Sequence, residues 1–398
     1  MKRLEALLQQ LCPDGVIYKR LGDIATITRG GNFQKKDYRE NGFPCIHYGQ
    51  IYTKFNLFVT EPISHISDEK AAQQKKAKPG DIIMAVTSEN IEDVCKCIAW
   101  LGNREIAVSG HAAIIHHRLN PKFLAYFLSS SLFYKQKLSM AQGTKVIEVS
   151  PEKLKNILLP VPPLEIQQEI VRILDHFTEL TAELTAELTA RKEQYIYYRN
   201  RLLAPTSQST WMTLGDIGKV AMCKRIMKAE TSPSGDVPFY KIGTFGKEPD
   251  AYISKAKYEE YRSKYSFPKK GDILISAAGT IGRTVIYDGE PAYYQDSNIV
   301  WVENDESIVL NRYLYYYYQL QPWSVSTGGT IARLYNDNIS KARISVPPLP
   351  EQRRIVSILD RFDALCNDLT SGLPAEIAAR QKQYEYYRDK LLTFKERV

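Results

Sequence analysis

Two kinds of hydrophobic pattern alternate along the chain. Short apolar runs that follow a Gly-Asp pair, "GDIIMAVT" from Gly80 and "GDILISAAG" from Gly271, predict buried β-strands. Longer stretches with an apolar residue at every third or fourth position predict helices, and the longest begins after "VPPL" and continues to about Leu203. The prolines exclude helix before this stretch and favour its start.

The long helix predicted after Leu164 carries an apolar seam typical of a coiled coil. Its apolar positions are mostly three or four residues apart: Ile170, Ile173, Phe177, Leu180, Leu184, Leu188, Tyr195, Tyr198 and Leu202. Within this helix "LTAELTAELTA" (180–190) repeats a short unit made largely of strong helix formers. Each unit adds roughly 6 Å of rise and about 40° beyond a full turn. The run therefore indicates a spacer whose length matters.

The whole pattern occurs twice. "VPPLEIQQEIVRILDHF" at 161–177 returns as "VPPLPEQRRIVSILDRF" at 346–362, and "QYIYYRNRLL" at 194–203 returns as "QYEYYRDKLL" at 383–392. The second copy holds about one more helical turn between the two motifs. It is also interrupted by "TSGLPAEI", where Gly372 and Pro374 should break or kink the helix. The order is therefore globular segment, long helix, globular segment, long helix.

Each globular segment mixes strand and helix signals. "LGDI" opens both, and "NPKFLAYFLSSSLFYKQKL" and "VLNRYLYYYYQLQ" have helical length, each with an asparagine expected as the N-cap. We predict an α+β fold with two similar globular domains separated by two long helices that form an antiparallel coiled coil. The predicted segments are an N-terminal helix (1–14), domain 1 (15–160), helical spacer 1 (161–205), domain 2 (206–345) and helical spacer 2 (346–398).

Composition limits the classes of protein that fit this architecture. The 398 residues are 44% hydrophobic and 25% charged, as in an ordinary globular protein, and no apolar run is long enough to span a membrane. Six cysteines without a CxxC pair argue against a disulfide framework or zinc module and favour the reducing cytoplasm. The net charge of +8 permits a polyanionic partner, and many of the 26 tyrosines stand beside basic residues, a mixture that suits contacts with nucleic acid.

Sequence motifs of catalysis are missing. There is no phosphate-binding loop, no GxGxxG turn, no GxSxG elbow and no HExxH pair. Asp81 and Asp272 lie in the repeated Gly-Asp turns and are expected to close those turns rather than to hold a metal. The sequence thus favours a binding protein. A coiled-coil scaffold that does not touch DNA, and an enzyme fused to a coiled coil, stay open as alternatives.

The repeated "VPPLxxQ" into "ILDxF", the "QYxYYRxxLL" motifs, the "LGDI" openings and the TAEL units resemble the specificity (S) subunit of type I restriction-modification systems, over essentially the whole chain. The resemblance implies a non-catalytic subunit with two target recognition domains, each recognising one half of a bipartite, asymmetric site in double-stranded DNA. It implies helices that space the domains and dock two modification subunits, which carry S-adenosylmethionine and methylate adenine. Restriction subunits would add ATP- and Mg-dependent translocation and cleavage. No cofactor is expected on this chain.

Candidate DNA contacts are polar and basic residues on loops, because base edges and phosphates are bound by such groups. In domain 1 they are Asn32, Gln34, Lys35, Lys36, Ser88, Asn90, Gln142, Thr144 and Lys145. In domain 2 they are Lys224, Arg225, Lys228, Thr280, Arg283, Gln295, Asn298, Thr330 and Arg333. The "GT" pairs occur in both copies, so we expect them to fix a shared loop or to contact phosphate.

Overall fold

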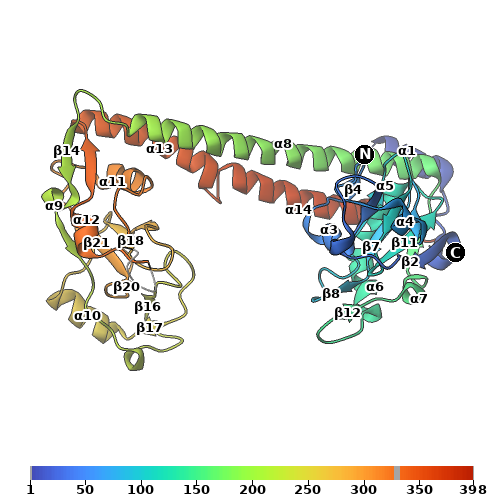
Figure 1. Ribbon diagram of the computed structural model, residues 1–398, viewed down its shortest axis with the longest axis horizontal. Helices are drawn as coiled ribbons and strands as arrows, with labels where there is room; N and C mark the ends of the chain where they lie inside the picture. The colour runs from blue at the N-terminus through green and yellow to red at the C-terminus, as the bar shows by residue number, and fades with distance from the viewer. Residues whose placement is uncertain (1, 327–331, 398) are drawn as a thin grey trace. The chain divides into compact units, whose positions relative to one another are not determined.

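The structure is a computed structural model that describes residues 2–326 and 332–397. The chain forms two compact units: unit 1 contains Met1–Thr185 and Glu376–Val398, and unit 2 contains Ala186–Ala375. Figure 1 labels their elements. The boundaries predicted from the sequence lie between globular domains and long helices. The boundary between the two compact units instead lies inside helix α8 (Leu164–Leu202). The reason is that the two halves of this helix pack on different hydrophobic cores.

Unit 1 is built on two sheets. The larger sheet has the strand order β2-β11-β7-β9-β4, and the smaller sheet has the order β5-β3-β10-β6. Their strands are β2 (Ala25–Arg29), β3 (Phe43–Ile46), β4 (Phe58–Val59), β5 (His65–Ile66), β6 (Lys76–Ala77), β7 (Ile82–Ala85), β9 (Cys97–Trp100), β10 (Ile106–Val108) and β11 (Ala112–His117). Every residue of β7 is buried, which confirms the strand predicted after the first Gly-Asp pair.

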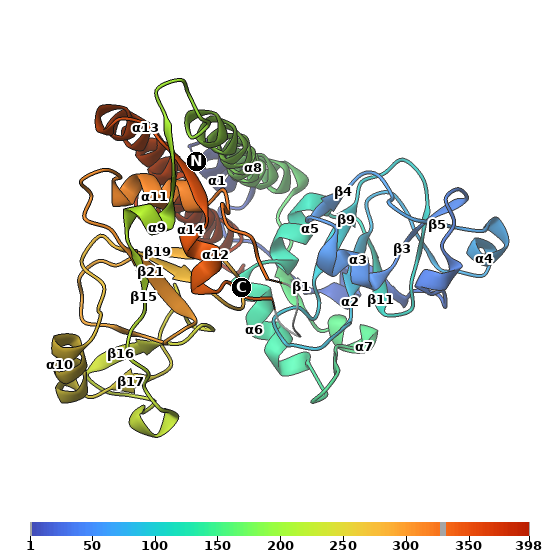
Figure 2. The ribbon, with the colours of Figure 1, turned by 60° about the vertical axis from the view of Figure 1, so that its left-hand side comes forward.

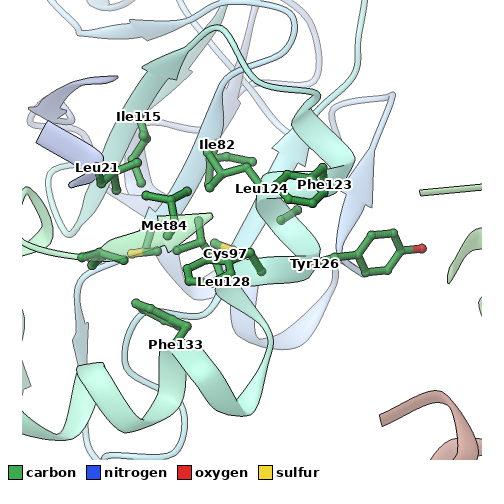
Figure 3. Close-up of a cluster of buried hydrophobic side chains, with 14 of the residues drawn as sticks. Leu21, Ile82, Met84, Cys97, Ile115, Phe123, Leu124, Tyr126, Leu128 and Phe133 are labelled. Atoms are coloured by element: carbon green, nitrogen blue, oxygen red, sulfur yellow. The ribbon is translucent and has the colours of Figure 1, made fainter. Parts of the chain in front are cut away.

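Two short strand pairs and several helices complete unit 1. The pairs are β1 (Tyr18–Arg20) with β13 (Leu158–Pro160) and β8 (Thr87–Ser88) with β12 (Ile147–Glu148). The helices are α1 (Lys2–Leu11), α2 (Leu21–Ile24), η1 (Lys35–Asp37), α3 (Tyr48–Thr53), α4 (Asp68–Ala72), α5 (Pro121–Leu128), α6 (Ser131–Met140), α7 (Pro151–Leu154) and the first part of α8. Figure 3 shows side chains of β7, β9, β11, α5 and α6 meeting in one core.

Unit 2 repeats this plan with fewer strands. Its sheets have the orders β15-β21-β18-β19 and β17-β16-β20, and β14 pairs with β22. The strands are β14 (Thr210–Thr213), β15 (Lys219–Ala221), β16 (Val237–Tyr240), β17 (Tyr252–Ile253), β18 (Ile273–Ser276), β19 (Thr284–Ile286), β20 (Tyr293–Tyr294), β21 (Ile299–Glu303) and β22 (Arg343–Val346). The helices are α9 (Leu214–Ile217), η2 (Lys228–Glu230), α10 (Lys255–Lys264), α11 (Asn311–Tyr318), α12 (Asn336–Ser340) and α13 (Leu349–Asn367). Helix α10 lies beside β16 and β17 (Figure 2). Its Tyr258 packs with buried residues of the smaller sheet.

One of the two expected asparagine caps is wrong. Asn120 does cap α5, since its side chain accepts from the backbone N–H groups of Lys122 and Phe123. Asn311 instead lies inside α11, after Leu310, and its buried amide bonds to Asn304 and Asp272. The predicted helix after Asn120 is also divided, because the hydroxyl of Ser130 caps a second helix, α6.

The aspartates of the Gly-Asp turns close those turns, as predicted. Asp81 accepts from the backbone N–H of Lys78 at 2.7 Å, and Asp272 accepts from that of Lys269 at 2.7 Å. In each unit the turn leads directly into a buried central strand, β7 in unit 1 and β18 in unit 2.

One glutamine of each repeat joins the long helix of that repeat to the domain that precedes it. In unit 1 the buried Gln167 accepts from the N–H of Asn120 and donates to the carbonyl of Pro162. In unit 2 Gln352 accepts from Leu310 and donates to Pro347 and Ile308. The glutamine of each "VPPLxxQ" motif therefore fixes the start of its long helix against the N-cap of a domain helix, α5 in unit 1 and α11 in unit 2.

The helices pair side by side in both units. In unit 1 Phe177 of α8 stacks on Tyr387 of α14 (Leu373–Leu391), with 5.3 Å between ring centroids. In unit 2 Phe362 of α13 contacts Tyr195 and Tyr198 of α8, and one turn further along α13 Cys366 lies near Lys192. The contacts move to lower residue numbers on α8 as they move to higher residue numbers on α13, so the two helices are antiparallel. The predicted interruption is confirmed, since α13 ends at Asn367 and α14 begins at Leu373.

Candidate nucleic-acid interface

The polar loops of unit 1 meet around the turn formed by residues 109–111, which precedes β11. The chain after β2 runs against this turn, because Gly30 and Gly31 donate to the carbonyls of Ala112 and Val108. A Cβ at Gly30 would lie 2.2 Å from the carbonyl oxygen of Ser109, so a side chain cannot fit there. The glycine pair thus allows the loop that carries Asn32 and Gln34 to lie beside the turn.

A surface pocket of about 500 Å³ lies between these segments, and Asn32, Gln34 and His111 are among the residues that line it. Two more lining residues, His47 and Tyr48, have ring centroids 4.5 Å apart, and the ring of Tyr48 is 4.9 Å from that of His111. Burial, followed by the charges of Lys35 and His111, lowers the pKa of His47. The pocket therefore combines aromatic faces and neutral hydrogen-bonding groups with the Arg29 guanidinium, a mixture that suits contacts with nucleic acid.

Arg29 connects this turn to a second loop. Its Nε donates to the carbonyl of Gly110 at 2.6 Å, and its Nη1 lies 2.9 Å from the carboxylate of Glu148. Glu148 belongs to β12, which pairs with Thr87 and Ser88 of β8. The loops at 88–93 and 142–146 are therefore held next to one another and to the turn at 109–111.

The candidates of domain 1 fall into three groups. Asn32 and Gln34 line the pocket, and Lys35 and Lys36 are exposed in η1 next to it. Asn90 uses its amide within its own loop, because it donates to Asp93 and accepts from the Asp93 N–H. The others lie beside the β8–β12 strand pair, where Ser88 is half-buried and Gln142, Thr144 and Lys145 are exposed.

Unit 2 builds an equivalent turn at residues 296–298, before β21. Arg225 donates from Nε to the carboxylate of Asp296 at 2.9 Å, and Arg333 donates from Nη2 to the carbonyl of Ser297 at 2.8 Å. Ser297 adopts a left-handed φ of 56°. Two loops distant in sequence thus place arginines on one short turn.

Strand register defines which positions match between the units. Thr28 pairs with Ile114 in unit 1, and Ala221 pairs with Trp301 in unit 2. The matched positions that follow from these pairs and from the shared "VPPL" motif are Asn32 with Arg225, Ser109 with Asp296, Gly110 with Ser297, and Glu148 with Arg333. The carbonyl at the centre of the turn accepts from a guanidinium in both units, but the arginine is Arg29 in one and Arg333 in the other. The framework is shared and its polar side chains differ.

The other candidates of domain 2 have varied surroundings. Lys224 is exposed, with its ammonium over the ring of Tyr265, and Lys228 and Thr280 are exposed. Arg283 donates to the carbonyl of Phe245, and Gln295 accepts from the N–H of Ile242, so both support neighbouring loops. Asn298 is half-buried in the turn at 296–298. Thr330 lies outside the described residues.

Several residues of this interface were missed by the sequence analysis: Arg29, His47, Tyr48, His111, Asp296 and Tyr335. Arg29 has a local signal, because it directly precedes the glycine pair. Asp296 lies between the candidates Gln295 and Asn298, and Tyr335 lies two residues after Arg333. His47, Tyr48 and His111 come from segments that reach the candidate loops only in the folded chain. Across the part of the chain that the structure describes, no group of acidic, histidine or cysteine residues could hold a metal ion. None of the described helices is long and apolar enough to cross a membrane.

Two matched α+β domains, each with a polar loop interface and each joined to long helices, define a repeated binding protein. The family model for the type I restriction modification DNA specificity domain matches residues 13–193 and 208–379, and the chain belongs to this family. A putative type I restriction enzyme specificity subunit of Haemophilus influenzae is 53% identical over 303 residues, which cover 74% of this chain and 76% of that protein. The EcoR124I/EcoR124II specificity subunit of Escherichia coli is 35% identical over 62% of this chain and 65% of its own length.

Solved structures share the fold. One from a study of assembly and conformational transition in a type I restriction-modification system has a TM-score of 0.61 at 19% identity, and the match covers 95% of this chain and 97% of that one. The S subunit of M. genitalium has a TM-score of 0.52 at 14% identity and covers 94% of this chain and 96% of its own. These structures confirm the predicted fold class. The family model and the relatives from Haemophilus influenzae and Escherichia coli confirm the predicted role in DNA sequence specificity.

Proposed function

We propose that the chain is the non-catalytic specificity subunit of a type I restriction-modification complex and that its two domains recognise the two halves of an asymmetric DNA site. The observation that carries this proposal is the pair of turns at 109–111 and 296–298. The same framework presents different hydrogen-bonding side chains at matched positions, which is what recognition of two different base sequences requires.

The long helices are the proposed docking surface for two modification subunits. Tyr197 and Tyr386 occupy the same position of the repeated "QYxYYR" motif and are 57% and 60% exposed. Each has a basic residue one turn later: Arg201 donates to the Tyr197 hydroxyl, and the Lys390 ammonium lies over the Tyr386 ring. An exposed surface that occurs twice suits two copies of one partner.

The cofactors are assigned to the partners, with S-adenosylmethionine on the modification subunits and ATP with Mg on the restriction subunits. The free thiols of the six cysteines, five of them buried, fit a complex that works in the cytoplasm. The purified chain, given DNA, S-adenosylmethionine and ATP, should neither methylate nor cleave. Methyl transfer by the chain alone would contradict its assignment as non-catalytic.

The decisive test exchanges residues 206–345 for the same segment of a relative with a different methylated site. Sequencing of the sites methylated by the reconstituted complex should show a change in one half-site only. A change in both halves, or in neither, would contradict independent recognition by two domains. Salt-dependent binding to duplex DNA separates this proposal from the scaffold alternative, because neutralisation of phosphates gives a steep dependence on salt and a scaffold gives none.

A further inference from the structure

Two arginines of unit 2 converge on the turn at 296–298. Arg225 comes from the loop after β15 and is paired with the Asp296 carboxylate, while Arg333 comes from the chain before α12 and is bonded to the Ser297 carbonyl. Two guanidinium groups thus contact one short turn, Arg225 through a carboxylate and Arg333 through a backbone carbonyl.

The ion pair leaves the outer part of Arg225 available. The bond to Asp296 uses Nε, and across residues 2–326 and 332–397 neither Nη group of Arg225 has a hydrogen-bond partner. The Arg225 side chain is 66% exposed, whereas that of Asp296 is 16% exposed. A largely buried carboxylate therefore orients a guanidinium whose two Nη groups can still donate.

Asp296 is itself held in place. The hydroxyl of Ser297 donates to its carboxylate at 3.1 Å, and the bond from Arg333 fixes the carbonyl of Ser297, whose left-handed φ shapes the turn. A guanidinium oriented in this way loses less side-chain entropy when it binds a ligand than a freely rotating one does.

In the major groove guanine presents two acceptors, O6 and N7, that match two parallel N–H donors. Adenine presents a donor at N6 where guanine has O6, so a second N–H would be opposed. On the basis of the proposed function, we propose that Arg225, oriented by Asp296, recognises a guanine in the half-site of domain 2. Arg225 is the specificity-determining residue and Asp296 is its positioning residue.

The matched position in domain 1 supports the assignment and supplies a second variant. Asn32 stands where Arg225 stands and lines the pocket of unit 1. An asparagine amide forms a bidentate pair with adenine, because its N–H donates to N7 and its oxygen accepts from the N6 amino group, an arrangement that guanine does not offer. Arg225→Asn should therefore favour adenine at the position that carries guanine in the native half-site.

The experiment uses the complete complex and the sequences of its methylated sites. The half-site that changes when residues 206–345 are exchanged must contain a G·C pair. Arg225→Ala should lower the preference for guanine at one position about 5- to 150-fold and leave the other half-site unchanged. Arg225→Lys keeps the charge but loses the paired donors, so it should also lose the preference for that guanine. Asp296→Ala should weaken the preference at that same position only.

Arg333→Ala is the matched control, because Arg333 uses an Nη group on the protein backbone. Because this bond also supports the turn that carries Asp296, the variant should reduce methylation at all sequences and should weaken the preference for that guanine less than Asp296→Ala does. A half-site without a G·C pair, or an unchanged motif in Arg225→Ala and Arg225→Lys complexes that still methylate, would overturn the inference. If exchange of residues 206–345 changes its half-site while the Arg225 variants do not, the proposed function stands and only the role of Arg225 fails.

Discussion

Arg312 of α11 donates from Nε to the carboxylate of Asp360 on α13 across 2.6 Å. The hydroxyl of Tyr316 donates to the same carboxylate. In unit 1 the matching Asp175 of α8 accepts from Lys122, also across 2.6 Å. The aspartate of each "ILDxF" motif therefore bonds its helix to the domain before it, and the repeat in sequence has a structural cause.

Loss of this carboxylate should weaken the attachment of α13. We expect Asp360→Ala to lower the free energy of unfolding by about 1–2 kcal/mol, since charged hydrogen bonds are lost at a partly exposed site. Asp360→Asn, which keeps an acceptor, should cost less. Asp337→Ala removes an exposed ion pair with Lys341 and should change stability by less than about 0.5 kcal/mol. Urea unfolding of the three variants would measure the difference, and equal costs for Asp360→Ala and Asp337→Ala would argue against the docking role.

Gln352 is fully buried and serves three backbone groups, so its replacement should be more costly. Gln352→Leu leaves the N–H of Leu310 and the carbonyls of Ile308 and Pro347 without their partner. Because each unpaired buried group costs about 1–3 kcal/mol, we expect a loss of at least about 2 kcal/mol. Gln352→Glu keeps an acceptor for Leu310 but buries a carboxylate against the carbonyl oxygens of Ile308 and Pro347, so near neutral pH it should cost at least as much as Gln352→Leu. If Gln352→Leu left the temperature of thermal unfolding unchanged, water would be replacing these hydrogen bonds.

His117 predicts a dependence of stability on pH. Burial lowers its pKa to about 4, although Asp81 acts in the opposite direction. The unfolded state therefore binds a proton below about pH 6.5 that the folded state does not bind until about pH 4. Stability should fall as the pH is lowered through this window, by up to about 3 kcal/mol. In His117→Asn the same titration should be flatter between pH 6.5 and 4, and a variant with an unchanged slope would assign the effect to other groups.

Much of the architecture could be predicted because it is written twice and because its signals are local. The Gly-Asp turns, the proline-initiated helices and the break near Gly372 each depend on a few neighbouring residues. The interface could be predicted only in part. Asp296 lies between the candidates Gln295 and Asn298, but its role depends on an approach of Arg225 from a loop 71 residues away, which the local sequence does not indicate. Asn311 was wrongly predicted as an N-cap for the same reason, because its buried partner Asp272 comes from a distant turn.

The TAEL run occupies the part of α8 where the two compact units divide. Leu184 and Leu188 are half-buried while Glu183 and Glu187 are exposed, so the repeat keeps its leucines on one face of the helix. Four residues rotate a helix by about 400°, and removing them changes the direction of that face by only about 40°. The helical stretch after domain 2 has an interruption between Asn367 and Leu373 that can absorb a change of this size.

Deletion of Thr185–Leu188 should therefore give a folded and active complex whose two half-sites are unchanged but whose spacer is one or two base pairs shorter. The helix loses about 6 Å of rise, and base pairs are stacked about 3.4 Å apart. Deletion of Thr185 and Ala186 alone rotates the remaining helix by about 200°, turns glutamates toward the apolar seam and should abolish activity. Sequencing of the methylated sites decides the matter: an active four-residue deletion with an unchanged spacer would show that the run does not set the distance between the half-sites.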